Sequence, residues 1–393
     1  MAITSTSYRV LGRSAPASGT TATLYTAGAN LSAVISTLSI CNQAATAATY
    51  TIAVCPGGAA IVPKHYIAYG ATVSAQETIA LTIGITLASS DRIVVRSANG
   101  STSFNLFGSE ISEISNAPPG TIEYFMVAGG GGGGSNGGGG GGAGGILYTS
   151  TQVVSAGVPY VITVGSGGAY GPSATVGTTG TVSSIVGGSV SVASRGGGGG
   201  ASRDGGGAGS FGGSGGGGAD AAASPQTNQG GGITGQGFNG GAGSLGAGGG
   251  GGGGGGTTGF AGSGGQPGAG GTGSTAYTVL LSMANRGINV SGTYYIAGGG
   301  AGGRCQGLGT LNASGGLGGG GNSLNATSAN GIDNTGGGGG GGGNIGGSGG
   351  SGIVIVRYSD LNSIAASTTG NPAYTSTNGY KIYTFINSGS ITF

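Results

Sequence analysis

The chain has 393 residues, of which 36% are hydrophobic and 5% are charged, and its net charge is +2 at pH 7. This length allows two or three domains, and so small a net charge provides no basic surface for nucleic acid. Disordered segments usually combine high net charge with low hydrophobicity, so only the 106 glycines argue for disorder. No apolar stretch is long enough for a membrane-spanning helix, and the first residues lack the pattern of a secretory signal. We therefore expect synthesis in a cytoplasm and no membrane insertion.

The first segment, residues 1–116, contains few glycines and many Thr, Ser, Val, Ile and Ala residues. Apolar and polar residues alternate in Tyr50–Val54 and Thr78–Ile83, as is typical of strands with one buried face. Turn signals such as Pro56-Gly57-Gly58 separate these runs, and no helical period is present. The pattern predicts an all-β N-terminal sandwich or jelly roll. Its predicted strands lie at residues 7–11, 23–26, 33–41, 49–55, 65–69, 78–85, 92–97 and 103–107.

The second segment, residues 117–358, contains most of the glycines and follows a boundary at Pro118-Pro119. Strand-like runs at Ile122–Val127 and Ile353–Tyr358 bracket it, and we expect these two strands to pair. Further strands are predicted at residues 160–164, 182–192 and 294–297. The third segment, residues 359–393, regains a β-like composition. It predicts a short C-terminal β-hairpin, formed by residues 380–385 and 390–393, that packs on a neighbouring sheet; a mobile tail is the alternative.

Uninterrupted glycine runs, such as Gly129–Gly134 and Gly248–Gly256, have few ordered conformations open to them. An α-helix costs about 1 kcal/mol per glycine, and a strand without side chains has nothing to pack. The extended polyproline II geometry remains, with three residues per turn and no internal hydrogen bonds. Glycine helices of this kind can approach on every side and bond laterally, so we predict a domain of packed polyglycine II helices. A flexible linker is the alternative, while a collagen helix is disfavoured because no Gly-X-Y register holds.

Polar inserts separate the glycine runs, and we expect inserts that alternate along the chain to emerge at the same end of the bundle. Loops on a rigid scaffold are common recognition sites. Aromatic and amide side chains suit saccharide or protein surfaces through stacking and hydrogen bonds. The candidate receptor-contact residues in these inserts are Asp220, Gln226, Asn228, Gln229, Phe260 and Tyr277.

Residues that could support catalysis or metal binding are sparse. The three cysteines, Cys41, Cys55 and Cys305, form no CxxC pair, so neither a disulfide framework nor a zinc site is expected. The one histidine, His65, reads as a sheet-surface residue, and Glu110 and Glu113 read as a solvated pair rather than a glycosidase pair. We expect no enzyme activity, no cofactor and no metal.

The glycine-rich segment resembles a known group of proteins. It opens with Gly120-Thr-Ile-Glu-Tyr-Phe-Met-Val-Ala-Gly-Gly and closes with Gly349-Gly-Ser-Gly-Ile-Val-Ile-Val-Arg-Tyr358. This pattern resembles the glycine-rich domains of bacteriophage tail-fibre and adhesin-like proteins, which are frequent in phages of marine bacteria and cyanobacteria. The segment Gly379–Phe393 resembles what usually precedes such a domain, yet here it comes last.

The resemblance implies a virion structural protein, a tail fibre or tail-tip adhesin. Its N-terminal β-domain would attach to other virion proteins, and its loops would bind a host-cell surface glycan or an outer-membrane protein. The structural alternative is a capsid decoration or tail-bracing protein with the glycine-rich domain as a rigid spacer. A non-viral cell-surface or ice-binding protein is a third class. Fibres are usually threefold, so the resemblance admits a homotrimer, although no heptad pattern supports one.

Overall fold

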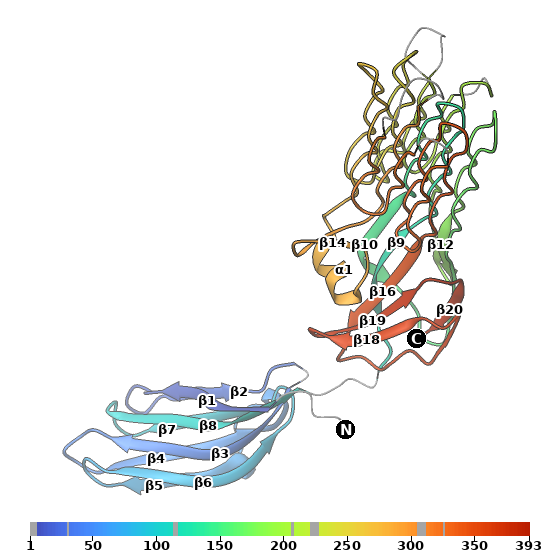
Figure 1. Ribbon diagram of the computed structural model, residues 1–393. Helices are drawn as coiled ribbons and strands as arrows, with labels where there is room; N and C mark the ends of the chain where they lie inside the picture. Colours follow the sequence, from blue (N-terminus) through green and yellow to red (C-terminus); the bar gives the residue numbers. More distant parts are fainter. Residues whose placement is uncertain are drawn as a thin grey trace. The chain divides into compact units, whose positions relative to one another are not determined.

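The computed structural model describes residues 6–29, 31–112, 117–205, 208–220, 228–304, 312–324 and 327–393. The chain divides into two compact units, Met1–Ala117 and Pro118–Phe393 (Figure 1). The division lies beside Pro118 and Pro119, whose missing N–H groups cannot contribute to strand pairing.

The described residues of the first unit form eight antiparallel strands, one for each strand predicted from the sequence. Two four-stranded sheets form in the orders β1-β8-β3-β6 and β2-β7-β4-β5. This order, in which most connections cross between the sheets, is that of a jelly roll, so the structure selects one of the two predicted architectures. The strands are β1 (Thr6–Ser14), β2 (Thr21–Thr26), β3 (Leu31–Asn42), β4 (Ala48–Cys55), β5 (Tyr66–Val73), β6 (Thr78–Leu87), β7 (Arg92–Ser97) and β8 (Thr102–Ser112).

The core of the first unit lies between these sheets and depends on a register shift in β3. Ala33 and Ile35 are fully buried on one side of the shift, and Leu38 and Ile40 are fully buried on the other. Strict alternation would turn one of these pairs outward. The pairing of β3 with both neighbours shifts between Ile35 and Thr37, so the extra residue keeps both pairs facing the core.

In the part of the second unit that the structure describes, two five-stranded sheets form in the orders β10-β9-β16-β19-β18 and β13-β12-β11-β20-β17. A hydrophobic cluster joins them, with Met126 from the first sheet and Ile162 from the second among its fully buried members. The strands of the first sheet are β9 (Thr121–Val127), β10 (Ile146–Val153), β16 (Ile353–Ser359), β18 (Ala373–Thr377) and β19 (Tyr380–Phe385). Those of the second are β11 (Pro159–Thr163), β12 (Ser183–Gly187), β13 (Val190–Ser194), β17 (Ser367–Thr369) and β20 (Gly389–Thr392).

The three central strands of the first of these sheets, β9, β16 and β19, are buried on both faces. Phe125 and Val127 of β9 point away from the second sheet and pack with Leu280 and Leu281 of the helix α1 (Thr278–Ala284). The sequence analysis predicted no helix, because α1 is short and lies inside a polar insert. A hairpin of β14 (Ile288–Val290) and β15 (Thr293–Tyr295) follows it.

A buried ion pair lies on the same face of the sheet as α1. Glu123 of β9 and Arg357 of β16 are direct cross-strand partners, and their side chains approach to 2.8 Å with exposed fractions of only 10% and 12%. The Arg357 guanidinium also lies 4.3 Å from the ring centroid of Tyr380 and donates to the sulfur of Met283 at 3.3 Å. Arg357 therefore links the helix to three strands of the sheet.

The two bracketing strands pair as predicted, since β9 and β16 are antiparallel neighbours from Val127–Ile353 to Glu123–Arg357. The C-terminal residues complete both sheets of the second unit. β18 and β19 form a hairpin, and β19 pairs with β16. The predicted pairing of 380–385 with 390–393 is wrong in detail, because β20 leaves this sheet and pairs with β11 and β17 in the other one.

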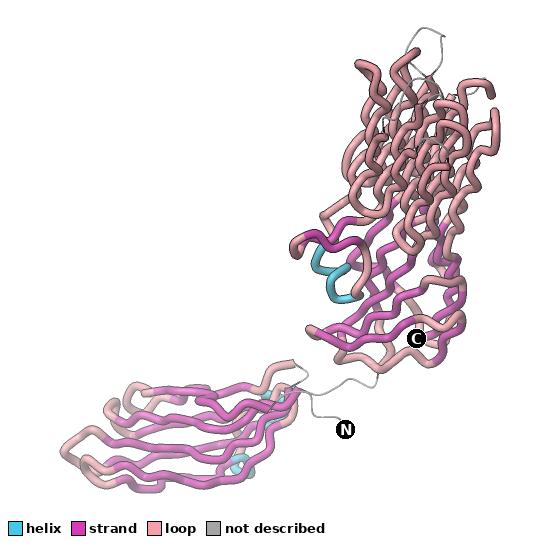
Figure 2. The backbone as a smooth tube through the Cα atoms, in the orientation of Figure 1, coloured by secondary structure: helices cyan, strands magenta, loops and turns pink. Residues whose placement is uncertain are grey.

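The glycine runs stand side by side at one end of these sheets, where Figure 2 draws them as loops. The run 129–134 shows how they bond. Its N–H groups donate, in rotation with a period of three residues, to three antiparallel neighbours at residues 178–181, 347–350 and 139–142. Its C=O groups accept in the same rotation from three parallel neighbours at residues 168–171, 197–200 and 339–342. A threefold period with lateral bonds only is the polyglycine II geometry, and it satisfies the buried backbone mutually.

Glycine is required in this lattice because neighbouring backbones fill the space that a side chain needs. A Cβ atom at any residue from Gly129 to Gly134 would lie 1.8–2.1 Å from a carbonyl oxygen of another run. Ala143 is tolerated because its methyl group joins the side-chain cluster around Phe125 and Ile146 rather than facing a backbone.

The inserts do not alternate between the two ends of the bundle as the sequence suggested. Ala201 and Asp220 both lie near the end far from the sheets, since Ala201 bonds to Gly217 and Asp220 to Gly137. The chain reverses between them at Ser214, inside a glycine-rich stretch. Thr257 and Thr272, from successive inserts, are bonded to each other at the end nearest the sheets. Small residues can therefore reverse the chain without a polar insert. Such a turn has no recognisable signal in the sequence.

Candidate functional site

Bulky side chains within the glycine bundle stand on its outside, because its interior has no room for a Cβ atom. Phe211, Phe238 and Phe260 are 52%, 43% and 58% exposed. The runs of Phe211 and Phe238 both bond to the run that lies between them, since Gly212 donates to Gly231 and Gly240 donates to Gly230. The run of Phe260 bonds directly to that of Phe238 through Gly259 and Asn239. This flank of the bundle is therefore a rigid backbone surface that carries exposed aromatic rings.

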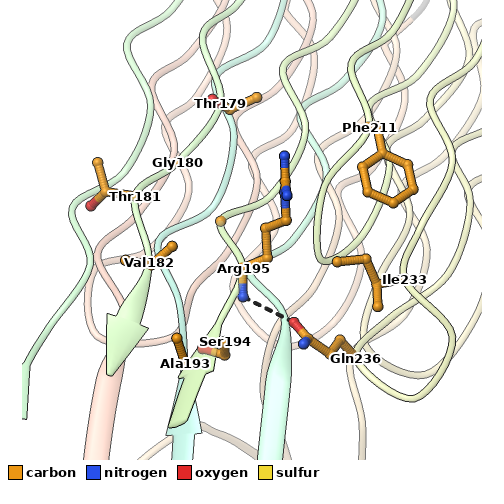
Figure 3. A pocket seen from close by; sticks show the side chains of 11 residues that line it. Thr179, Gly180, Thr181, Val182, Ala193, Ser194, Arg195, Phe211, Ile233 and Gln236 are labelled. Carbon is orange, nitrogen blue, oxygen red and sulfur yellow. Dashed lines mark hydrogen bonds between the residues drawn. The ribbon is translucent and has the colours of Figure 1, made fainter. Parts of the chain in front are cut away.

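A cavity of about 620 Å³ opens where this flank meets the ends of β12 and β13. Its apolar wall includes Val182, Phe211 and Ile233, and its polar groups include the side chains of Arg195 and Gln236 (Figure 3). None of the described residues that line it is acidic. The full lining is Thr179, Gly180, Thr181, Val182, Ala193, Ser194, Arg195, Gly196, Phe211, Ile233 and Gln236.

Arg195 is held in this cavity through its backbone and its guanidinium. It follows the last residue of β13, and its N–H donates to Oε1 of Gln236 at 2.9 Å. The guanidinium carbon lies 5.5 Å from the ring centroid of Phe211, within the range of a cation–π contact, and Figure 3 shows it extending beside that ring. In the part of the chain that the structure describes, the guanidinium has no hydrogen-bond or ion-pair partner. The cavity thus presents an exposed and unpaired positive charge.

A second cavity, of about 400 Å³, lies on the other side of the loop Ile233–Gly237, and Gln236 lines both. Phe238, Asn239 and Thr258 line it together with Tyr277. The ring centroid of Tyr277 lies 4.7 Å from that of Phe125 and 5.3 Å from that of Tyr148, and both pairs are tilted. Burial raises the pKa of the Tyr277 hydroxyl above the ordinary value.

The residues expected to contact a receptor do not form one site. Asp220 is fully buried, and its Oδ1 accepts from Gly246. Asn228 is half-buried, and its amide is bonded to Ala219 and Gly243. Gln229 is half-buried and Gln226 lies outside the described residues. Phe260 is exposed on the flank, and Tyr277 lies beside α1.

The far end of the bundle also uses many of its polar groups internally. Asn136 donates to Oδ2 of Asp204 at 2.7 Å, and the Ser135 hydroxyl donates to the carbonyls of Pro172 and Thr175. These bonds stabilise the turns, so these polar groups are already bonded within the protein and are not free to bind a ligand. Sequence reasoning missed Arg195, Phe211, Gln236 and Phe238, although the exclusion of side chains from a glycine lattice could have placed both phenylalanines outside.

The residues considered for catalysis lie in the first unit. His65 ends a short 3₁₀ turn (Pro63–His65) rather than lying in a strand, and its Nδ1 accepts from the Val62 N–H. Glu110 was expected to be solvated, but its carboxylate pairs with Arg9 and accepts a hydrogen bond from the Tyr25 hydroxyl. Glu113 lies outside the described residues. Within the described ranges, no cluster of three or more His, Cys, Asp or Glu side chains could hold a metal ion. No helix in those ranges is long and apolar enough to cross a membrane.

Comparison with known proteins identifies the glycine-rich part of the chain. A family model described as a glycine-rich domain matches residues 108–359, which is more than half of the sequence. The match covers the bundle and both bracketing strands. A search of curated proteins found no match, and a search of solved structures found none.

Proposed function

We propose that this chain, which belongs to the glycine-rich domain family, is a structural protein of a bacteriophage particle, a tail fibre or tail-tip adhesin. The first unit attaches the chain to other virion proteins. The second unit binds a host-surface glycan or an outer-membrane protein.

The observation that carries the proposal is the bonding of the glycine bundle. The run 129–134 is held on all sides by backbone hydrogen bonds, and bulky residues such as Phe211 and Phe260 face outward from runs at the surface of the bundle. A scaffold of this kind presents aromatic and polar groups without losing conformational entropy on binding, which favours adhesion to a surface.

The architecture of the first unit supports the same proposal by analogy. Jelly rolls occur widely in viral capsid and lectin domains, and the strand order here is that of a jelly roll. Because a fold alone does not determine function, this argument only adds to the one from the bundle.

One observation favours the structural alternative, a capsid decoration or tail-bracing protein. At the far end of the bundle the side chains of Asn136, Asp204 and Asn228 bond within the protein. A rigid spacer needs such closed turns, whereas a receptor-binding tip needs free polar groups.

The experiment starts from purified phage particles in which mass spectrometry has detected the chain. Gold-tagged antibodies against the second unit are then used to label intact particles. Gold at the tail or its fibre tips is the expected result, and purified chain should then compete with particles for adsorption to host cells. Gold over the head supports the decoration role, and failure to find the chain in any phage particle contradicts both candidates.

A further inference from the structure

We propose that the cavity beside Arg195 binds an acidic saccharide, whose carboxylate pairs with the guanidinium while its sugar ring packs on Phe211. Such binding does not depend on the proposed function and can be tested on the purified chain.

The size and position of the cavity suit a small ligand. Its volume of about 620 Å³ lies within the range of about 300–1,000 Å³ that is typical of ligand pockets. It lies at the junction of a sheet and the glycine bundle, and the bond from the Arg195 backbone to Gln236 ties its walls together. A ligand therefore meets a largely preformed site.

The polar groups of the cavity are mainly donors. The guanidinium of Arg195 offers only N–H groups. Gln236 already uses its Oε1 to accept from the Arg195 backbone, so its amide nitrogen is the part left for a ligand. The hydroxyl of Thr179 has no partner among the described residues and can adopt either role. Because no acidic residue described in the structure lines the cavity, the ligand that complements it carries acceptors, and a carboxylate can bind an arginine with two hydrogen bonds.

The apolar wall distinguishes a saccharide from a simple anion. Phe211 is 52% exposed and Val182 is 47% exposed, and both line the cavity with Ile233. Inorganic phosphate or sulfate would leave this surface wet. A neutral apolar ligand would leave Arg195 without a partner. A sugar acid has both a carboxylate and an apolar C–H face, so it uses the charge and the aromatic ring together.

The arrangement of Arg195 reduces the cost of binding. Its backbone is tied to Gln236, and its guanidinium already lies beside the Phe211 ring, so part of the side-chain freedom that binding costs has already been lost. The ring and the guanidinium also act as a pair, and a change in either one should weaken the site.

The test is isothermal titration of the full chain with trigalacturonate, compared with neutral galactotriose. We expect trigalacturonate to bind at least tenfold more tightly. Arg195→Gln should lose at least tenfold in affinity for trigalacturonate, since a hydrogen bond to a charged group is worth that much, and Phe211→Ala should lose several-fold. Lys64→Gln, which removes one exposed charge from the first unit, and Phe260→Ala, which removes an exposed ring outside the cavity, are the matched controls and should bind unchanged.

Three outcomes would overturn the inference. The first is equal affinity of Arg195→Gln and the natural chain, with circular dichroism showing both to be folded. The second is equal binding of galactotriose and trigalacturonate, or tighter binding of triglutamate, which would indicate a peptide site. The third is no binding of trigalacturonate, of a sialylated trisaccharide or of a sulfated trisaccharide at millimolar concentration. Gold labelling of particles is unaffected by any of these results, so failure of this inference and failure of the proposed function remain distinguishable.

Discussion

Replacing Gly133 by alanine should strongly destabilise the second unit, because the new methyl group has no space in the lattice. Its Cβ would lie 2.1 Å from the carbonyl oxygen of Gly340, whereas ordinary contact begins at 3.4 Å. The run 337–342 must therefore move by roughly 1.3 Å, and overpacking of this kind costs about 1–3 kcal/mol. The displacement also strains two bonds, from Gly339 to Gly131 and from Gly342 to Gly134.

Each of these bonds contributes about 1 kcal/mol, so the predicted loss is about 3–5 kcal/mol in the free energy of unfolding. Urea unfolding of the full chain, followed by the near-ultraviolet circular dichroism of its tyrosines, measures this loss. The matched control is Gly231→Ala, whose Cβ would meet only the edge of the Phe211 ring at 3.2 Å. An exposed ring can move aside, so the control should change stability by less than about 1 kcal/mol. Equal effects of the two variants would refute the close packing of the glycine backbones.

Three further predictions concern the sheets of the second unit. Arg357→Met should destabilise the second unit by about 3–5 kcal/mol in urea unfolding, because the buried Glu123 loses its partner. Adding Glu123→Gln to this variant should restore part of the lost stability, and no restoration would contradict the pairing. Burial, with a hydrogen bond to a neighbouring tyrosine, raises the pKa of Tyr358 above the ordinary value of about 10. As the pH rises, the unfolded chain therefore loses this proton before the folded chain does. The free energy of unfolding should fall above pH 10 by about 1.4 kcal/mol per pH unit because of this group. Tyr358→Phe should show a shallower fall of the melting temperature between pH 9 and 11, and an unchanged slope would exclude this cause. Phe393→Ala should cost about 3–5 kcal/mol because the ring is only 4% exposed, whereas Phe260→Ala, at 58% exposure, should cost less than about 0.5 kcal/mol; similar melting temperatures for the two variants would be inconsistent with the core described above.

The first unit was accessible to sequence reasoning because its strands alternate. Tyr50–Val54 and Thr78–Ile83 show the two-residue period, and β4 and β6 form there. The period could not choose between a sandwich and a jelly roll, since that choice depends on which strands pair. Nor could it place the register shift beside Ile35, which depends on the partner strands.

The glycine lattice was predictable because glycine excludes most alternatives. Its turns were less so, since the reversal at Ser214 uses only small residues and carries no polar signal. The helix α1 was missed because Thr278–Ala284 is too short to show a helical period, and it is stabilised by packing on Phe125 and its neighbours.

The candidate site was only partly predictable for a related reason. Phe260 was placed on the surface correctly, since it is 58% exposed. Asp220 is instead enclosed by its own turn, because a carboxylate can accept a backbone N–H such as that of Gly246. Arg195 and Gln236 are 41 residues apart and meet only through the bundle, so no local pattern connects them.

The most direct test of a rigid, backbone-bonded scaffold is native-state hydrogen exchange of the glycine amides. The amides of Gly130–Gly134, which donate to neighbouring runs, should exchange as slowly as those of β9 and β16. Exchange of these glycines at the rate of an unstructured peptide, with the strands still protected, would contradict such a scaffold.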